Sequence, residues 1–247
     1  MISLDKKFIF MHIPKTGGTS IERSVLEPYA YYFEDDRENK IMEKYLSKQM
    51  DENTSHNENA EVDDRKFIGK HFTLQDYYSA LTNSEDFDTY FNKDDYVNLN
   101  SNPLDHFYSF TVVRNPWDRL VSHFLMNAKE FTEDSFRDYI SSFLGDVHQH
   151  VERDYFYDSV TKLNLLPQVD WLADISKFDK IIKFENLDEG FRQVCIDLEI
   201  PHETLPHLNK REGRGHYSEY YNEEPKQMVI DAWGDDITLF NYSYETV

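Results

Sequence analysis

The sequence Pro-Lys-Thr-Gly-Gly-Thr-Ser at residues 14–20 constrains the fold of this chain more than any other stretch. It follows an apolar run at residues 8–13 and precedes residues 21–26, which can continue as a helix. A buried strand, a glycine turn and a helix N-terminus form an anion-binding arrangement, because the first helical N–H groups lack intrahelical partners and carry partial positive charge. The stretch therefore predicts a cradle for a phosphate or sulfate group.

Side chains within this stretch add to the expected cradle. Lys15 supplies a full positive charge, and the two adjacent glycines let the backbone approach an anion closely. The order of residues differs from the general P-loop pattern G-x-x-x-x-G-K-[ST], because the lysine comes before the glycines. A strand-to-helix turn whose glycines only relieve strain is the alternative interpretation. The other candidate residues of the cradle are Thr16, Gly17, Gly18, Thr19 and Ser20.

A second strand, tight turn and helix are expected around Arg114. Residues 107–113 have the composition of a buried strand, and Pro116 suits the first turn of the helix that follows. Arg114 would end the strand, and Ser122 would lie about two turns into the helix. An arginine fork can hold a phosphate through charge-assisted hydrogen bonds, each worth about 1.5–3 kcal/mol. A second anion site is therefore predicted at this junction.

A third candidate residue is His71. Residues 67–71 are short enough to form a buried strand that ends at this histidine. In parallel α/β sheets, residues at the carboxyl ends of the strands face the ligand crevice. His71 is therefore a candidate site residue, and a histidine that is simply hydrogen-bonded within a loop is the alternative.

The charge balance of the chain limits its partners. Lys and Arg together number 26 against 47 Asp and Glu, so the formal net charge is −21. Such a surface repels nucleic acid and anionic membranes, and neither is an expected partner. A protein this acidic must concentrate its few cations where it binds an anion. Lys210, Arg211 and Arg214 lie in a late glycine-bearing loop that predicts such a clamp, although a solvated basic loop has the same composition.

Length and composition indicate a single α/β domain over residues 1–247. A polar stretch at residues 34–66 is expected to be an insertion or a mobile loop. The chain has one cysteine, which excludes an internal disulfide and a cysteine-based metal site. A cytoplasmic location is predicted, because the sequence shows no signal peptide and no apolar run of about 18 residues. Helices are also predicted at residues 132–144, 187–198 and 225–233, and a strand at residues 180–184.

The two junctions together resemble the two nucleotide-binding motifs of the sulfotransferase family, in the same order. IPKTGGTS at residues 13–20 is similar to its 5′-phosphosulfate loop, and VVRNPWDRLVSHF at residues 112–124 is similar to its 3′-phosphate motif. KHFT at residues 70–73 resembles the stretch with the catalytic histidine in the heparan sulfate 2-O-sulfotransferase branch. IKFENL at residues 182–187 and LPHLNK at residues 205–210 are similar to later blocks. The resemblance implies a three-layer α/β fold, with a central parallel sheet like that of P-loop NTPases flanked by helices.

The resemblance also implies a reaction. The donor would be 3′-phosphoadenosine 5′-phosphosulfate (PAPS), with adenosine 3′,5′-bisphosphate (PAP) as product, and the sulfonyl group would pass to an acceptor hydroxyl. Lys15 would contact the bridging oxygen, where charge develops in the transition state. His71 would be the general base, since an imidazole pKa near ~6.5 suits that task, and His12 and Glu22 are the other candidates. This chemistry requires no metal.

The remaining roles follow by position in the two motifs. The acceptor is expected to be a neutral or lightly charged glycan or a small hydroxylated molecule, because a heavily sulfated polymer needs an extended basic groove. Residues 16–20 would cradle the 5′-phosphate, Arg114 and Ser122 would hold the 3′-phosphate, and Lys210, Arg211 or Arg214 would close over it.

Two other functions stay open from the sequence. A nucleotide kinase or another phosphoryl transferase can use the same kind of cradle, and it would need magnesium and bind ATP tightly. A catalytically inactive nucleotide-binding protein would bind the product nucleotide and release no sulfated compound. The oligomeric state is open as well.

Overall fold

The computed structural model of this chain describes residues 2–3, 6–26, 107–127, 131–144, 165–172, 174–202, 204–205 and 214–245. The strand predicted at residues 67–71 lies outside these ranges, and so does the polar stretch at residues 34–66.

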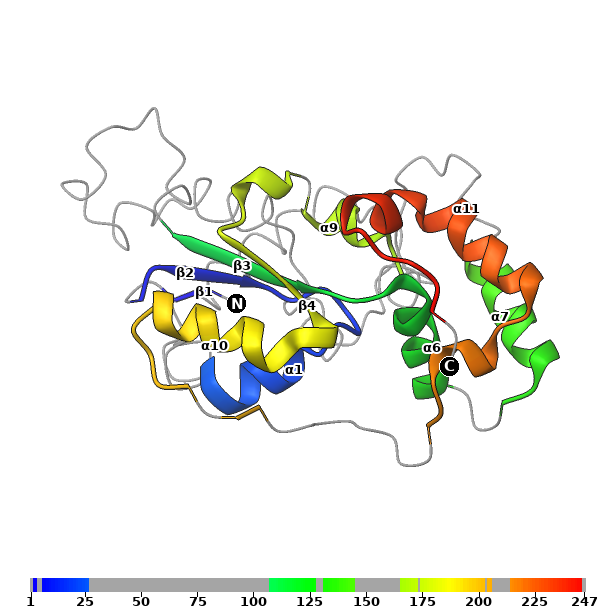
Figure 1. Ribbon diagram of the computed structural model, residues 1–247, viewed down its shortest axis with the longest axis horizontal. Coiled ribbons are helices and arrows are strands. Elements are labelled where there is room, and N and C mark those ends of the chain that lie inside the picture. The colour runs from blue at the N-terminus through cyan, green and yellow to red at the C-terminus, as the bar shows by residue number, and fades with distance from the viewer. Residues whose placement is uncertain are drawn as a thin grey trace, which may run out of the picture.

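Within the described residues, four strands form one sheet at the centre of the structure (Figure 1). The strand order is β1-β2-β3-β4, in which β2, β3 and β4 are parallel and β1 pairs antiparallel with β2 at one edge. Parallel strands need crossover connections, which place helices over the faces of the sheet. The strands are β1 (Ile2–Ser3), β2 (Phe8–Met11), β3 (Tyr108–Val113) and β4 (Lys180–Lys183).

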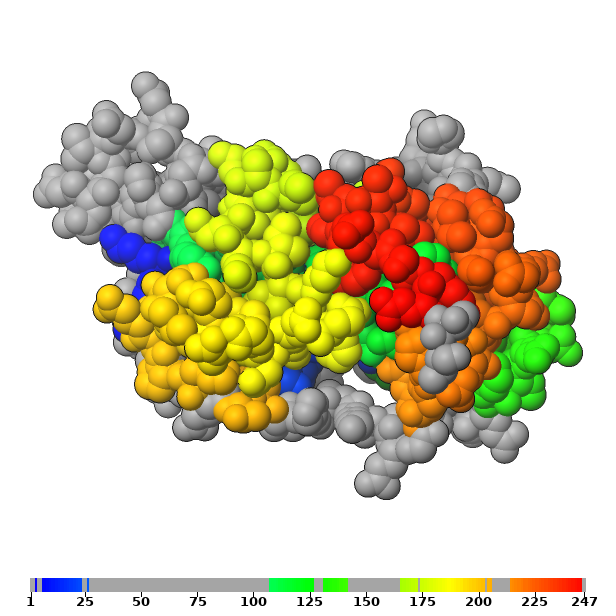
Figure 2. Space-filling view, in the orientation of Figure 1, coloured from blue at the N-terminus to red at the C-terminus, as the bar shows by residue number. Residues whose placement is uncertain are grey.

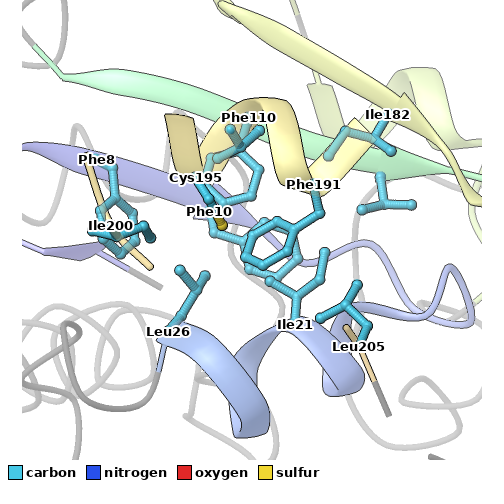
Figure 3. Close-up of a cluster of buried hydrophobic side chains, with 12 residues drawn as sticks. Phe8, Phe10, Ile21, Leu26, Phe110, Ile182, Phe191, Cys195, Ile200 and Leu205 are labelled. Atoms are coloured by element: carbon cyan, nitrogen blue, oxygen red, sulfur yellow. The ribbon is translucent and has the colours of Figure 1, made fainter. Parts of the chain in front are cut away.

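One apolar cluster lies between the sheet and the short helices α1 (Gly18–Ile21) and η1 (Glu22–Leu26), together with α10 (Leu187–Asp197) (Figure 3). The Phe10 and Phe110 rings stack with their centroids 4.9 Å apart, since alternate residues of neighbouring strands share a face. The other members are Phe8, Ile21, Leu26, Val112, Ile182, Phe191, Val194, Cys195, Ile200 and Leu205. Burial in this cluster raises the pKa of the Cys195 thiol to about 11.

A second cluster covers the opposite face of the sheet, where α9 (Gln168–Leu172) lies (Figure 1). With helices over both faces, the sheet is the middle layer of an α/β structure. The fold class predicted from the sequence is therefore confirmed, and the antiparallel edge strand β1 is an addition to it. The members of this cluster are Met11, Ile13, Val113, Trp171, Leu172 and Phe240.

Three longer helices pack together beyond the end of β3: α6 (Pro116–Asn127), α7 (Glu133–Leu144) and α11 (Glu223–Leu239). Pro116 begins α6 as predicted, because its missing N–H costs nothing in the first helical turn. Ser135 N donates to Thr132 Oγ1 at 3.0 Å, so Thr132 caps α7 at the first residue of the predicted range.

Helix α11 is longer than its apolar pattern predicts. The pattern indicates an end at Trp233, whereas the helix continues to Leu239 across a non-helical Trp233 with φ −122° and ψ 32°. The added part contains Asp236, which is fully buried and accepts hydrogen bonds from Gln168 N at 2.7 Å and Val169 N at 2.9 Å. The carboxylate therefore caps the first turn of α9 from a distant helix, and no local pattern signals that contact.

Residues 240–245 run across the surface after α11. Figure 2 shows them in red, between the yellow segment that contains β4 and α10 and the orange α11. Tyr242 Oη donates to Glu185 Oε2 at 3.1 Å, and Lys183 Nζ donates to Asn241 O at 3.1 Å. The Tyr244 ring meets the edge of Trp117 at 5.4 Å between centroids. This segment therefore packs on the end of β4 and on the first turn of α6.

We expect Asp236→Ala to lower the free energy of unfolding by about 3–5 kcal/mol, because it removes the acceptor of two buried N–H groups and a negative charge that acts on the buried Arg119. Urea unfolding followed by circular dichroism measures this change. The matched control is Asp231→Ala, which removes an exposed carboxylate from the same helix and should cost less than about 1 kcal/mol. Equal losses in the two variants would contradict the capping role.

Candidate functional site

Residues 14–20 form a tight loop between β2 and α1. Gly17 has φ 89°, a left-handed conformation that glycine adopts without strain, and Ser20 N donates to Gly17 O at 3.0 Å. Gly18 lies against His12, since a Cβ built on Gly18 would be 2.3 Å from His12 Cδ2. The shape of the loop by itself therefore requires both glycines.

The hydroxyl residues of the loop differ in their surroundings. Thr16 is fully buried, and its Oγ1 donates to Ile13 O at 2.8 Å. Its hydroxyl thus fastens the loop to the end of β2. Ser20 is buried in α1, whereas Thr19 beside it is half-buried. Of these three predicted cradle residues, Thr19 has the most exposed side chain.

Lys15 has a left-handed backbone with φ 68°, which costs a non-glycine residue about 1–2 kcal/mol. Its Nζ lies 3.4 Å from Met126 Sδ, and no carboxylate of the described residues lies within ion-pair distance of it. Burial lowers the pKa of the Lys15 ammonium, and so do the positive charges of Arg114 and Arg214. A bound anion would relieve this repulsion.

Arg114 follows β3 and reaches back to the loop. Its Nη1 donates to Lys15 O at 3.0 Å, and its Nε donates to Asp118 Oδ2 at 2.8 Å. The guanidinium carbon lies 4.0 Å from the centroid of the Phe184 ring. Burial lowers the pKa of Arg114, and the Asp118 carboxylate opposes that effect. The arginine of the second predicted anion site therefore contacts the lysine of the first.

Arg214 joins the same group from the late basic loop. Its Nη2 contacts Asp118 Oδ1, whereas Arg114 Nε donates to the other carboxylate oxygen of Asp118. Its Nε is buried and has no hydrogen-bond partner among the residues that the structure describes. Lys15, Arg114 and Arg214 are thus close enough to repel one another, and Asp118 pairs with the two arginines, in a chain whose net charge is −21. The excess positive charge and the unsatisfied donor both favour an anionic ligand.

Other segments hold the backbone around Arg114. The Gln168 amide accepts from Arg114 N at 2.8 Å and donates to Arg114 O at 2.9 Å. Asn115 N donates to Glu185 Oε1 at 2.8 Å, and Asn115 Oδ1 caps α6 by accepting from Trp117 N at 3.1 Å. The place of the guanidinium is therefore fixed through its own backbone as well as by its contacts.

His12 and Glu22 form a buried pair beneath the loop. Nδ1 of His12 lies 2.9 Å from Glu22 Oε1, and the two residues are only 6% and 8% exposed. The His12 ring stacks on Phe10 and lies against Gly18. Their burial makes them poorer candidates for a general base than an accessible histidine would be.

Another histidine, His123 of α6, lies close to Lys15 without being predicted as a site residue. It is fully buried and contacts the Tyr139 hydroxyl. Burial and the charges of Lys15 and Arg119 lower the pKa of His123 to about 3. The imidazole is therefore neutral at pH 7.

Of the predicted site residues, the structure brings together Lys15, its loop, Arg114 and Arg214. Ser122 is half-buried on α6. The predicted roles of three residues stay predictions, because His71, Lys210 and Arg211 lie outside the described part of the chain. Within that part, no three His, Cys, Asp or Glu side chains are grouped so that they can hold a metal ion.

Sequence reasoning missed several residues that support the site. Asp118 and Arg119 stand in the same motif as Arg114, and the i, i+4 spacing of Arg114 and Asp118 is a recognisable ion-pair signal. Gln168 and Asp236 carry no such signal, because their partners are far away in the sequence.

We expect Gly18→Ala to lower the free energy of unfolding by about 1–3 kcal/mol, because the added methyl group would displace His12 and the loop. Urea unfolding followed by circular dichroism measures this change. Gly234→Ala is the matched control, since a Cβ there meets nothing within 4 Å, and it should not lower the free energy of unfolding. Wild-type stability in Gly18→Ala would show that the His12 contact does not set the conformation of the loop.

None of the helices in the described ranges is long and apolar enough to cross a membrane. No curated protein and no solved structure matches the chain at a significant level. The model of the sulfotransferase family matches residues 1–243, a range that contains both strand–turn–helix junctions. The family's P-loop-like α/β fold agrees with the parallel strands and flanking helices found here. The chain therefore belongs to the sulfotransferase family.

Proposed function

We propose that this chain transfers a sulfonyl group from PAPS to a hydroxyl group of a carbohydrate or a small molecule. Family membership supports sulfonyl transfer in general. The proximity of Lys15, Arg114 and Arg214 is the observation that favours PAPS as the donor, because two strand–turn–helix junctions contribute cations to one site. A nucleoside with phosphates at both its 3′ and 5′ positions would match such a site.

In this proposal, the two ends of the donor bind to different elements. The loop at residues 16–20 would hold the 5′-phosphate, mainly through N–H groups at the start of α1. Arg114, Ser122 and Arg214 would hold the 3′-phosphate. Asp118 would orient both guanidinium groups, since it contacts each of them. Lys210 and Arg211 would add charge from the same late loop.

The chemistry assigns roles to Lys15 and His71. The acceptor oxygen forms a bond to sulfur while the bond from sulfur to the bridging phosphate oxygen breaks, and the acceptor proton passes to a base. Lys15 would stabilise the charge that develops on the bridging oxygen. His71 would accept the proton, a role that typically contributes about 10²–10⁴-fold in rate. The sulfonyl group carries less charge than a phosphoryl group, so the proposed reaction needs no metal.

The acceptor would be a neutral or lightly charged glycan or a small hydroxylated molecule. The likeness of residues 70–73 to the 2-O-sulfotransferase branch favours a sugar hydroxyl. The net charge of −21 disfavours a heavily sulfated polymer, which the protein surface would repel. In this proposal, residues 1–247 form one sulfotransferase domain.

The function is tested with donor that carries radiolabelled sulfur and a panel of neutral glycans and small alcohols. We expect labelled acceptor from the wild type. We also expect about a 10²-fold to 10³-fold loss of turnover in Lys15→Ala, because the variant lacks a charge aimed at the leaving oxygen. Circular dichroism checks that the variant is folded. Near-normal turnover in a folded Lys15→Ala would remove the assigned role.

The same assay separates the alternative functions. Equal transfer with and without a metal chelator, and no hydrolysis of ATP, would exclude a magnesium-dependent phosphoryl transferase. Binding of PAP with no labelled product across the acceptor panel would instead support a catalytically inactive nucleotide-binding protein.

We expect Arg114→Ala to weaken binding of PAP far more than binding of 5′-AMP. The variant loses a positive charge beside the proposed 3′-phosphate, and one charge-assisted bond of about 1.5–3 kcal/mol corresponds to a loss of at least about tenfold. Calorimetry with both nucleotides measures the difference. Arg137→Ala removes an exposed arginine of α7 and is the control. Equal losses for both nucleotides in Arg114→Ala would contradict a 3′-phosphate site.

A further inference from the structure

Arg119 is a fully buried arginine in the first turns of α6, and the site as proposed gives it no role. Its Nε donates to Pro14 O at 3.0 Å, and its Nη1 donates to Leu166 O at 2.8 Å. One guanidinium thus joins the loop after β2 to the segment that leads into α9. Both contacts reach backbone carbonyl groups, which side-chain substitutions in those segments do not remove.

The carbonyl of Pro14 belongs to the peptide group that precedes Lys15. The peptide group that follows Lys15 is held as well, because Arg114 Nη1 donates to Lys15 O at 3.0 Å. The two dihedral angles of Lys15 are set by the orientations of these two peptide groups. Lys15 has φ 68°, a conformation that a non-glycine residue keeps only when its surroundings enforce it. The two arginines supply that enforcement, one on each side.

Arg119 is itself held firmly. Its guanidinium carbon lies 5.4 Å from the centroid of a Trp233 ring, and the buried Asp236 carboxylate interacts with its charge. Burial lowers the pKa of Arg119 to about 10, so it stays charged at pH 7. Arg119 of α6 therefore connects α11 to the loop at residues 14–20.

We infer that Arg119 is a positioning residue, which fixes the peptide group before Lys15 and so aims the Lys15 ammonium at the leaving oxygen of the donor. This inference rests on the proposed function for the role of Lys15, but the position of Lys15 can be measured without turnover. A lysine at position 119 would keep the positive charge beside Asp236. It would not reach both carbonyl groups, because a single ammonium lacks the planar fork of a guanidinium.

The test compares Arg119→Lys with the wild type in two measurements. The first is turnover at saturating PAPS, together with PAP affinity by calorimetry. The second is acetylation of Lys15 by acetic anhydride across a pH range, followed by mass spectrometry of the peptide that contains it. Arg137→Lys is the matched control, because Arg137 is 42% exposed on α7 and pairs with Asp134.

We expect Arg119→Lys to lose turnover by about 10-fold to 100-fold, as misplaced catalytic groups do, and to lose PAP affinity less than that. The pH midpoint of Lys15 acetylation should rise, because a released Lys15 would move toward solvent and away from the two arginines. Arg137→Lys should match the wild type in every measurement. An unchanged Lys15 midpoint in folded Arg119→Lys would overturn the inference, whatever happens to turnover.

The two proposals fail in different ways. Absence of sulfonyl transfer in the wild type would remove the proposed function, and the Lys15 midpoint would still decide the role of Arg119. If Arg119→Lys does not fold, hydrogen exchange of arginine Nε–H groups in the wild type decides instead. The Arg119 Nε–H should then exchange at least about tenfold more slowly than that of Arg137, since it is buried and bonded to Pro14 O. Equal exchange rates would overturn the inference.

Discussion

The hydrogen bond from the Arg114 guanidinium to the Lys15 carbonyl joins the strand–turn–helix junctions after β2 and β3 into one site. Each junction by itself is a common device for holding an anion at a helix N-terminus. Their union depends on the parallel pairing of β2 with β3, which brings the carboxyl ends of the two strands to the same edge of the sheet. The Gln168 amide holds the backbone of Arg114 at that edge, and the Asp236 carboxylate in turn holds Gln168.

The site gathers positive charge in a chain whose net charge is −21. Lys15 and Arg114 both lie in surroundings that lower their pKa values, and burial is the largest cause for each. Burying cations is unfavourable unless they are paired. The Asp118 carboxylate pairs with Arg114 and Arg214 but not with Lys15. The folded protein therefore holds an electrostatic arrangement that a dianionic ligand would stabilise. An acidic surface around such a site would also repel large polyanions.

The sequence predicted the fold where local patterns are strong. Their apolar composition predicts the strands around Phe10 and Phe110. The chemistry of one residue predicts the start of α6 at Pro116 and the start of the next helix at Thr132. The end of α11 could not be predicted from the sequence, because the buried Asp236 carboxylate is stabilised by N–H groups of α9 and not by its neighbours in sequence.

The site, too, has residues that local patterns predict and residues whose roles depend on distant contacts. Lys15, the glycines and Arg114 stand in recognisable motifs, and the structure places them together. The roles of Gln168 and Arg119 depend on backbone carbonyl and amide groups that lie far away in the chain, and no spacing rule reveals such partners. A side chain that binds backbone leaves no matching residue type in the sequence, which is why pattern reading does not find it.

The pairing of β2 with β3 has a consequence for how the protein folds. Thr111 Oγ1 donates to Met11 O across 100 residues of chain, and Arg119 reaches Pro14 O across 105. The entropy of closing a loop grows only with the logarithm of its length, and a doubling costs about 0.6 kcal/mol, so the intervening chain can vary in length at little thermodynamic cost. The kinetic cost is larger, because contacts between distant residues slow folding. The central strands and the anion site share these long-range contacts, so they should form in the same late step of folding.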